Sequence, residues 1–174
     1  DTAGKFVCAS AGHNLESILA ANGSGSVAAS KHPAQTVLNV DIGGGTTKFA
    51  LVTNGQIIET AAVNVGGRLV ATDTEGKIIR IEPAAHAVAD QLGIELHIGT
   101  VLSDVDRHSI ADTLAECLMD VIQRKPRSAL TQRLLLTPDL TSQTPIDTLV
   151  FSGGVSEYVY EREERDFGDL AMFM

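Results

Sequence analysis

Apolar and β-branched residues gather in three short runs between residues 37 and 65. The runs VLNVDI, TTKFALV and QIIETAAVNV have the length of strands, and they are separated by a glycine triplet and by Asn54-Gly55. An Asn-Gly pair between two such runs favours a tight hairpin, because both turn positions need a positive φ. The pattern therefore predicts a β-meander of three strands over residues 37–65.

The segment before the meander is predicted to hold a strand, a helix and a loop. The strand is predicted over residues 6–9 and the helix over 14–21, where the helical spacing puts three apolar residues on one face, namely Leu15, Ile18 and Leu19. The stretch 22–33 is rich in Gly, Ser and Ala and is predicted to be a loop. It could equally be a flexible excursion between two elements of a sheet.

The segment after the meander is predicted to form a second hairpin and a helix. The runs RLVATD and KIIRIEP flank a turn at Glu75-Gly76. Pro83 suits the first position of a helix, and Gly93 suits the residue that closes one, so a helix is predicted over residues 83–93.

The longest predicted helix covers residues 104–124. It opens at Ser103-Asp104, carries apolar residues at helical spacing, and must end before Pro126. A polar loop over 137–147 and a strand over 148–151 follow. The acidic stretch after this strand shows no clear closing helix.

Composition narrows the class of protein. The chain of 174 residues carries 13 Lys and Arg against 22 Asp and Glu, a net charge of −9, which argues against a nucleic-acid partner. Apolar runs stay well short of the roughly 20 residues that span a bilayer, and no signal peptide is recognisable, so we expect a cytoplasmic protein with no membrane contact. The two cysteines, Cys8 and Cys117, are expected to be buried free thiols.

The segment Asp41-Ile42-Gly43-Gly44-Gly45-Thr46-Thr47 is the strongest candidate for chemistry. Three glycines at the end of a strand let backbone N–H groups approach an anion, and we expect Gly44 to need a positive φ. The preceding carboxylate could hold a metal beside phosphate oxygens. The segment is neither a P-loop nor a dinucleotide fingerprint. A tight hairpin without a ligand is the alternative.

A second glycine turn, Ser152-Gly153-Gly154, also ends an apolar strand. Its glycines would let a flat or charged ligand lie against the backbone. A helix start or close packing would explain this turn taken alone. Two such turns, each at the end of an apolar strand, are less easily explained by packing.

These motifs carry a resemblance to a known superfamily. DIGGGTTKFALV resembles the second phosphate hairpin of the actin, Hsp70 and sugar-kinase superfamily, FSGGV resembles its adenosine motif, and Gly66-Gly67 resembles the glycine loop between them. The stretches AGHNLESILAANGSGS, NVGGRLV and FSGGVSEYVYEREERDFGDL are similar to the ethanolamine ammonia-lyase reactivating factors. The resemblance covers most of the chain.

The resemblance implies an α/β fold, one lobe of an actin-like ATPase with a mixed sheet and packed helices. Residues 1–174 would form a single nucleotide-binding lobe, with 68–136 as an inserted smaller subdomain. Only 40 residues precede Asp41 and no second DIG-type hairpin is among them, so the chain is expected to be the second lobe of a longer protein.

The resemblance also implies roles for individual residues. Asp41 would be the catalytic residue and the Mg²⁺ ligand, and the remaining candidates would bind ATP: Gly43, Gly44, Gly45, Thr46, Thr47, Gly66, Gly67, Gly153 and Gly154. Strand alternation should bury one of the two threonines, and it favours an exposed Lys48 over one that reaches phosphate.

The function implied by the resemblance is that of a chaperone-like, ATP-dependent reactivating factor. Its partner would be ethanolamine ammonia-lyase, from which it would release damaged cobalamin. ATP hydrolysis is expected of the full-length protein, whereas this chain alone should fold but bind ATP poorly. A small-molecule kinase and an actin-like filament or scaffold protein are the alternatives.

Other polar residues give weaker indications. The five histidines lack metal-ligand spacing and are expected to be solvated or packed. The acidic run of Glu161, Glu163 and Glu164 is expected to be a solvated helix face, with a partner-binding surface as the alternative. No Ser-His-Asp or Cys-His arrangement is recognisable.

Overall fold

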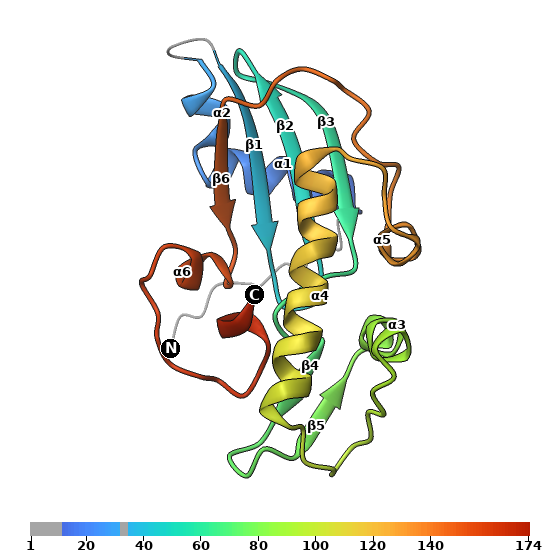
Figure 1. Ribbon diagram of the computed structural model, residues 1–174. Helices are drawn as coiled ribbons and strands as arrows, with labels where there is room; N and C mark the ends of the chain where they lie inside the picture. The colour runs from blue at the N-terminus through green and yellow to red at the C-terminus, as the bar shows by residue number, and fades with distance from the viewer. Residues whose placement is uncertain (1–11, 32–34) are drawn as a thin grey trace.

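A four-stranded mixed sheet is the centre of the fold in the computed structural model, which describes residues 12–31 and 35–174 (Figure 1). Its strands are β1 (Thr36–Ile42), β2 (Thr47–Thr53), β3 (Gln56–Val63) and β6 (Thr148–Ser152), in the order β3-β2-β1-β6. The first three are antiparallel, so the predicted meander is confirmed, while β6 runs parallel to β1. The predicted turn is confirmed too, because Asn54 and Gly55 have φ values of 51° and 76°.

One face of the sheet is covered by α1 (His13–Gly23) and the short α2 (Ser26–Ala29), as Figure 1 shows. The helix over 14–21 is confirmed, but the prediction of a loop throughout 22–33 is wrong at α2. Serine hydroxyl groups hold α2 against the sheet. The Oγ atoms of Ser24 and Ser26 donate to Oδ1 of Asn39 in β1, at 2.7 and 2.9 Å.

The apolar stripe of α1 does not face the sheet. Ser17 and Ala21 are buried, whereas the side chains of Leu15, Ile18 and Leu19 are 49%, 37% and 60% exposed. The three residues share a face as predicted, and that face points to solvent. Small residues contact the sheet because they let the helix lie close to it.

A two-stranded hairpin and a helix follow the sheet strands. β4 (Val70–Thr72) pairs antiparallel with β5 (Ile78–Ile81), and α3 (Pro83–Leu92) comes next. Pro83 stands in the first turn of α3, and Gly93 closes it with a φ of 69°. The predicted second hairpin and second helix are confirmed.

The long helix α4 (Asp104–Gln123) covers the other face of the sheet (Figure 1). Ser103 caps it by accepting a hydrogen bond from the N–H of Asp106, and Arg124 ends it with a φ of 52°. The helix predicted over 104–124 is therefore confirmed. A further helix, α5 (Ala129–Leu134), was not anticipated from the pattern; Ser128 caps it through the N–H of Thr131.

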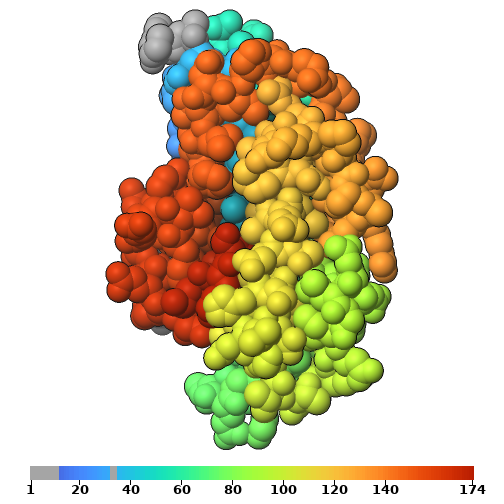
Figure 2. Space-filling model, in the orientation of Figure 1, coloured from blue at the N-terminus to red at the C-terminus, as the bar shows by residue number. Residues whose placement is uncertain are grey.

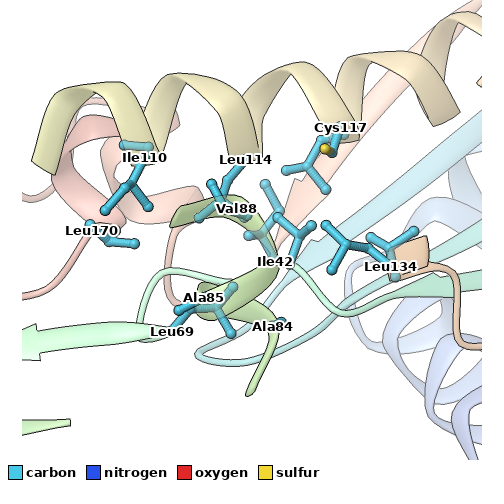
Figure 3. Close-up of a cluster of buried hydrophobic side chains, with 14 of the residues drawn as sticks. Ile42, Leu69, Ala84, Ala85, Val88, Ile110, Leu114, Cys117, Leu134 and Leu170 are labelled. Atoms are coloured by element: carbon cyan, nitrogen blue, oxygen red, sulfur yellow. The ribbon is translucent and has the colours of Figure 1, made fainter. Parts of the chain in front are cut away.

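One hydrophobic cluster joins the sheet, the hairpin and the helices. Figure 3 shows Ile42 of β1, Leu114 of α4 and Leu170 near the C-terminus within it. Side chains of residues 68–136 and of the sheet belong to this same cluster. The assignment of 68–136 to an inserted subdomain stays a prediction.

Three further predictions concerned membrane-spanning segments, the two cysteines and the N-terminal strand. Within the described residues, no helix is long and apolar enough to cross a membrane. Cys117 is a buried free thiol, as predicted, and burial raises its pKa. The strand predicted over 6–9 and Cys8 lie outside the described residues.

Candidate functional site

Two of the three glycine segments pack directly against each other at the end of β1. The N–H of Gly67 donates to the carbonyl of Gly43 at 3.0 Å, and the N–H of Arg68 donates to that of Gly44 at 2.6 Å. A Cβ on Gly66 would lie 2.6 Å from the carbonyl carbon of Gly44. Only a glycine at position 66 permits this contact between the two backbones.

The third glycine segment reaches the same place because β6 lies parallel to β1. Gly153 has a φ of +84°, and a Cβ there would lie 2.4 Å from the carbonyl oxygen of Ile42. The N–H of Val155 donates to that same oxygen at 3.3 Å. Segments more than a hundred positions apart in the sequence thus meet at the carboxyl ends of β1 and β6.

A pocket of about 490 Å³ lies where the three segments meet. Its lining comes from these segments and from the C-terminal residues: Gly43, Gly44, Gly67, Arg68, Gly154, Val155, Glu157, Tyr158, Arg162, Glu163, Phe167, Asp169 and Ala171. Four of the predicted site residues line it directly, namely Gly43, Gly44, Gly67 and Gly154. The other six predicted site residues do not line it.

The tip of the glycine hairpin is open. A Cβ on Gly45 would meet nothing within 4 Å, and one on Gly44 would make only ordinary contacts. The N–H groups of these two residues have no acceptor among residues 12–31 and 35–174. The expectation of a positive φ at Gly44 is wrong, because the carbonyls of Gly43 and Gly44 are held by N–H groups of the next segment.

The two threonines have different environments. Thr47 is fully buried, and its Oγ1 donates to the carbonyl of Val65 at 2.8 Å. Thr46 is half-buried, and its carbonyl accepts from the N–H of Gly43. The prediction that alternation buries one of them is confirmed. Lys48, expected to be exposed, is mostly covered and pairs with Glu16 of α1 at 3.2 Å.

Asp41 lies near the end of β1 on the face of the sheet that carries α1. The next residue, Ile42, is buried in the cluster with α4, so strand alternation turns Asp41 the other way. Its Oδ1 accepts a hydrogen bond from Oγ of Ser152 at 2.9 Å. This carboxylate therefore sits between the first and third glycine segments, although it does not line the pocket.

The C-terminal residues form one wall of the pocket, which the sequence did not reveal. After α6 (Ser156–Val159) the chain continues as a loop and ends in the 3₁₀-helix η1 (Ala171–Phe173), which lies against α4 (Figure 2). The N–H of Leu170 donates to the carbonyl of Gly67 at 2.7 Å. The only available signal was that these aromatic and charged residues directly follow Gly154.

The acidic run lies in the loop after α6 rather than on a helix face, and Glu163 of this run lines the pocket. Oε1 and Oε2 of Glu163 accept hydrogen bonds from the Arg165 guanidinium at 3.0 and 2.7 Å. These bonds, together with backbone N–H groups, lower the pKa of Glu163 to about 2. The expected solvated helix face is wrong, because α6 ends at Val159 and the run lies in the loop after it.

The wall also contains an aromatic hydroxyl. Burial raises the pKa of Tyr158, and the neighbouring carboxylates of Asp169 and Glu163 raise it further. The hydroxyl donates to the carbonyl of Arg165 at 2.7 Å. Tyr158 is thus fixed as a neutral side chain whose ring borders the pocket.

Charges of both signs line the pocket. Its guanidinium groups come from Arg68 and Arg162, and its carboxylates from Glu157, Glu163 and Asp169. A multiply charged anion would therefore need an accompanying cation to bind here. In the part of the chain that the structure describes, no group of three His, Cys, Asp or Glu residues could hold a metal by itself.

The structure is thus an α/β domain in which two neighbouring parallel strands end at a concave pocket. The chain belongs to the family described as Ethanolamine utilisation protein EutA, whose sequence model it matches over residues 1–174. The predicted resemblance to the ethanolamine ammonia-lyase reactivating factors is confirmed.

Two curated relatives are described as ethanolamine ammonia-lyase reactivase EutA. The chain is 35% identical to the ethanolamine ammonia-lyase reactivase EutA of Salmonella typhimurium (strain LT2) and 36% identical to that of Escherichia coli (strain K12), each over 170 residues. These alignments cover 96% of this chain and 36% of each relative. The chain thus spans little more than a third of the length of the curated relatives it matches.

Proposed function

We propose that this chain contributes one side of the ATP site of an actin-like ATPase. The observation that carries the proposal is the convergence of the three glycine segments on one pocket. A Cβ at Gly66 or Gly153 would strike backbone atoms of the β1 end, so these glycines keep the segments together. The N–H groups of Gly44 and Gly45 are left for an anionic ligand.

The pocket suits a nucleotide in size and chemistry. Its volume of about 490 Å³ falls in the usual range for ligand sites, and Gly154 has open space where a side chain would stand. In this proposal, Gly43, Gly44 and Gly67 lie beside the phosphates, while Gly154 and Tyr158 border the adenosine.

Mg²⁺ fits the residues around the hairpin. Mg²⁺ is commonly held by one or two carboxylates together with phosphate oxygens and water, and Asp41 supplies a carboxylate beside the glycine hairpin. The cation would also offset the excess of carboxylates over guanidinium groups in the pocket lining. When bound, Mg²⁺ would supply positive charge beside the phosphate oxygens.

The names of the relatives point to the biological role. We infer that the full-length protein is a cytoplasmic factor that reactivates ethanolamine ammonia-lyase by releasing damaged cobalamin at the expense of ATP. It would bind the lyase as a protein partner and would not act on ethanolamine. A small-molecule kinase and a filament protein are not favoured by these relatives.

The experiment replaces Asp41 in a full-length protein that carries this sequence. We expect Asp41→Asn to lower ATP turnover about a hundredfold or more, because Mg²⁺ loses its carboxylate. The unfolding temperature should change by less than about 2 °C, because asparagine can still accept from Ser152. Turnover is measured as phosphate release, and reactivation as recovery of inactivated lyase.

Asp147→Asn is the matched control. Asp147 lies at the other end of β1, where Oδ2 accepts from the N–H of Thr36, so the same chemical change is made away from the pocket. Turnover in this variant should stay near wild type. Normal ATP turnover in Asp41→Asn would overturn the proposed site, and a wild-type protein that restores no lyase activity would overturn the role.

A further inference from the structure

Arg68 lies directly against the open tip of the glycine hairpin. Its N–H is fixed to the carbonyl of Gly44 at 2.6 Å. Three carbons of its side chain lie 3.6 to 3.8 Å from the position that a Cβ on Gly44 would occupy. The side-chain stem therefore lies beside Gly44, one of the two residues whose N–H groups are open.

The guanidinium group of Arg68 is only loosely held. Its Nε lies 3.6 Å from Oδ2 of Asp169, which is longer than a hydrogen bond. The Arg68 side chain is 58% exposed, whereas that of Asp169 is 8% exposed. No other carboxylate among the described residues lies within 4.0 Å of this guanidinium. A long ion pair with an exposed guanidinium stabilises little, so Arg68 can change partner at small cost.

The other cations near the pocket are already engaged. Lys48 pairs with α1, on the other side of the sheet from α4. The Arg162 guanidinium lies over the ring of Tyr160 at 5.6 Å. Arg165 is bound through two nitrogen atoms to the Glu163 carboxylate. Arg68 is therefore the cation best placed to meet an anion at the hairpin tip.

We propose that Arg68 binds the terminal phosphates of the nucleotide, and that Asp169 is its counter-ion when no phosphate is bound. This inference rests on the proposed function, because it concerns the same pocket. The planar guanidinium presents paired N–H donors that match two oxygens of a phosphate. A bound polyphosphate would thus replace one weak partner by a stronger one.

Asp169 keeps its place when Arg68 leaves it. Its Oδ1 accepts from the N–H of Ala171 at 3.0 Å, and the neighbouring Leu170 is bonded to the carbonyl of Gly67. Asp169 therefore competes with phosphate for Arg68 from a fixed position. Removing its charge should favour phosphate binding.

The test measures binding of ATP and of inorganic tripolyphosphate by titration calorimetry, with a full-length protein that carries this sequence. We expect Arg68→Gln to weaken both ligands about tenfold or more, because it removes charge-assisted hydrogen bonds. AMP, which lacks the terminal phosphates, should lose much less affinity. We expect Asp169→Asn to change affinity in the opposite direction, with ATP bound several-fold more tightly.

Arg80→Gln is the matched control, because Arg80 forms an exposed ion pair with Glu82 at a distance from the pocket. It makes the same change in net charge and should leave ATP affinity unaltered. If Arg68→Gln binds ATP as tightly as Arg80→Gln does, this inference is wrong while the proposed function stands. If the wild-type protein binds no ATP, the proposed function itself fails.

Discussion

Glycines of the pocket have different structural roles, although they are chemically identical. Gly66 lies against backbone atoms of Gly44, and Gly153 lies against the carbonyl of Ile42. Gly45 contacts no atom that a methyl group would displace. Substitution to alanine should therefore separate glycines that hold the segments together from those that leave room for a ligand.

We expect Gly66→Ala to lower the free energy of unfolding by about 3 kcal/mol. A Cβ 2.6 Å from backbone atoms forces the hairpin and the second glycine segment apart, which exceeds ordinary overpacking. Gly45→Ala is the control and should be neutral or stabilising by up to about 1 kcal/mol. Urea unfolding followed by circular dichroism gives both values. Equal effects at the two positions would contradict the close approach at Gly66.

Sequence alone identified these glycines but not their roles. The pairs and the triplet stand out because each follows an apolar run. Which glycine contacts backbone and which faces the pocket depends on contacts between segments: the Gly66 segment packs on the hairpin, and β6 brings Gly153 beside β1. Strand alternation is a local pattern, and it correctly predicted that one of the two threonines is buried. The partners of Thr47 and Lys48, which are the Val65 carbonyl and α1, come from contacts between distant segments that no local pattern contains.

At the scale of elements, the polar loop over 137–147 is fastened to β3 by one carboxylate. Glu59 accepts hydrogen bonds from the N–H groups of Thr141 and Ser142 and from the hydroxyl of Thr141. Burial alone would raise the pKa of Glu59, but these hydrogen bonds outweigh burial and hold the pKa below its ordinary value of 4.5. The loop thus depends on the charged form of Glu59.

We expect Glu59→Gln to destabilise the chain by about 1 kcal/mol at pH 7, because its hydrogen bonds lose their charge. The folded-state pKa is lowered, so this contribution is fully present above pH 4.5 and is lost as the pH falls through the folded-state pKa. Unfolding in urea at pH 7 and at pH 3 should show the difference between wild type and variant shrinking. A difference that is the same at both pH values would contradict this role.

Elements with strong local patterning were predictable. The meander, the second hairpin and the two longest later helices follow from apolar spacing, Asn-Gly and the positions of Pro83 and Gly93. The orientation of α1 was not predictable. An amphipathic helix usually turns its apolar stripe toward the core, whereas the apolar stripe of α1 is exposed to solvent. The short α2 depends on serine hydroxyls that reach Asn39, a contact no local pattern contains.

At the scale of the whole molecule, the continuous hydrophobic cluster has a thermodynamic consequence. We expect this chain alone to unfold in one cooperative transition, because buried side chains of the sheet, α3 and α4 are shared. The same chain should bind ATP more weakly than about 1 mM, because phosphates held from one side remain in water, where each charge contact contributes little. Calorimetric unfolding and ATP titration measure the two properties.

Two separate transitions would show that residues 68–136 behave as an independent subdomain. Micromolar ATP affinity in this chain alone would show that the pocket needs no second lobe.

The glycine segments of the pocket were visible in the sequence, whereas its wall was not. The wall is positioned by long-range bonds, such as Arg107 Nη1 to Asp166 Oδ2 at 2.7 Å, which tie the C-terminal loop to α4.

The pairing of β1 with β6 also fixes when the pocket can form during synthesis. Thr36 and Asp147, which are bonded at the start of these strands, lie 111 positions apart, whereas β2 and β3 are joined by a two-residue turn. Closing the longer loop costs more chain entropy, so the hairpins can form while the ribosome is still adding residues, and β6 joins later. A polypeptide made only as far as α5 therefore carries two of the three glycine segments, and a ligand of this pocket can recognise only chains in which β6 and the residues after it have been made.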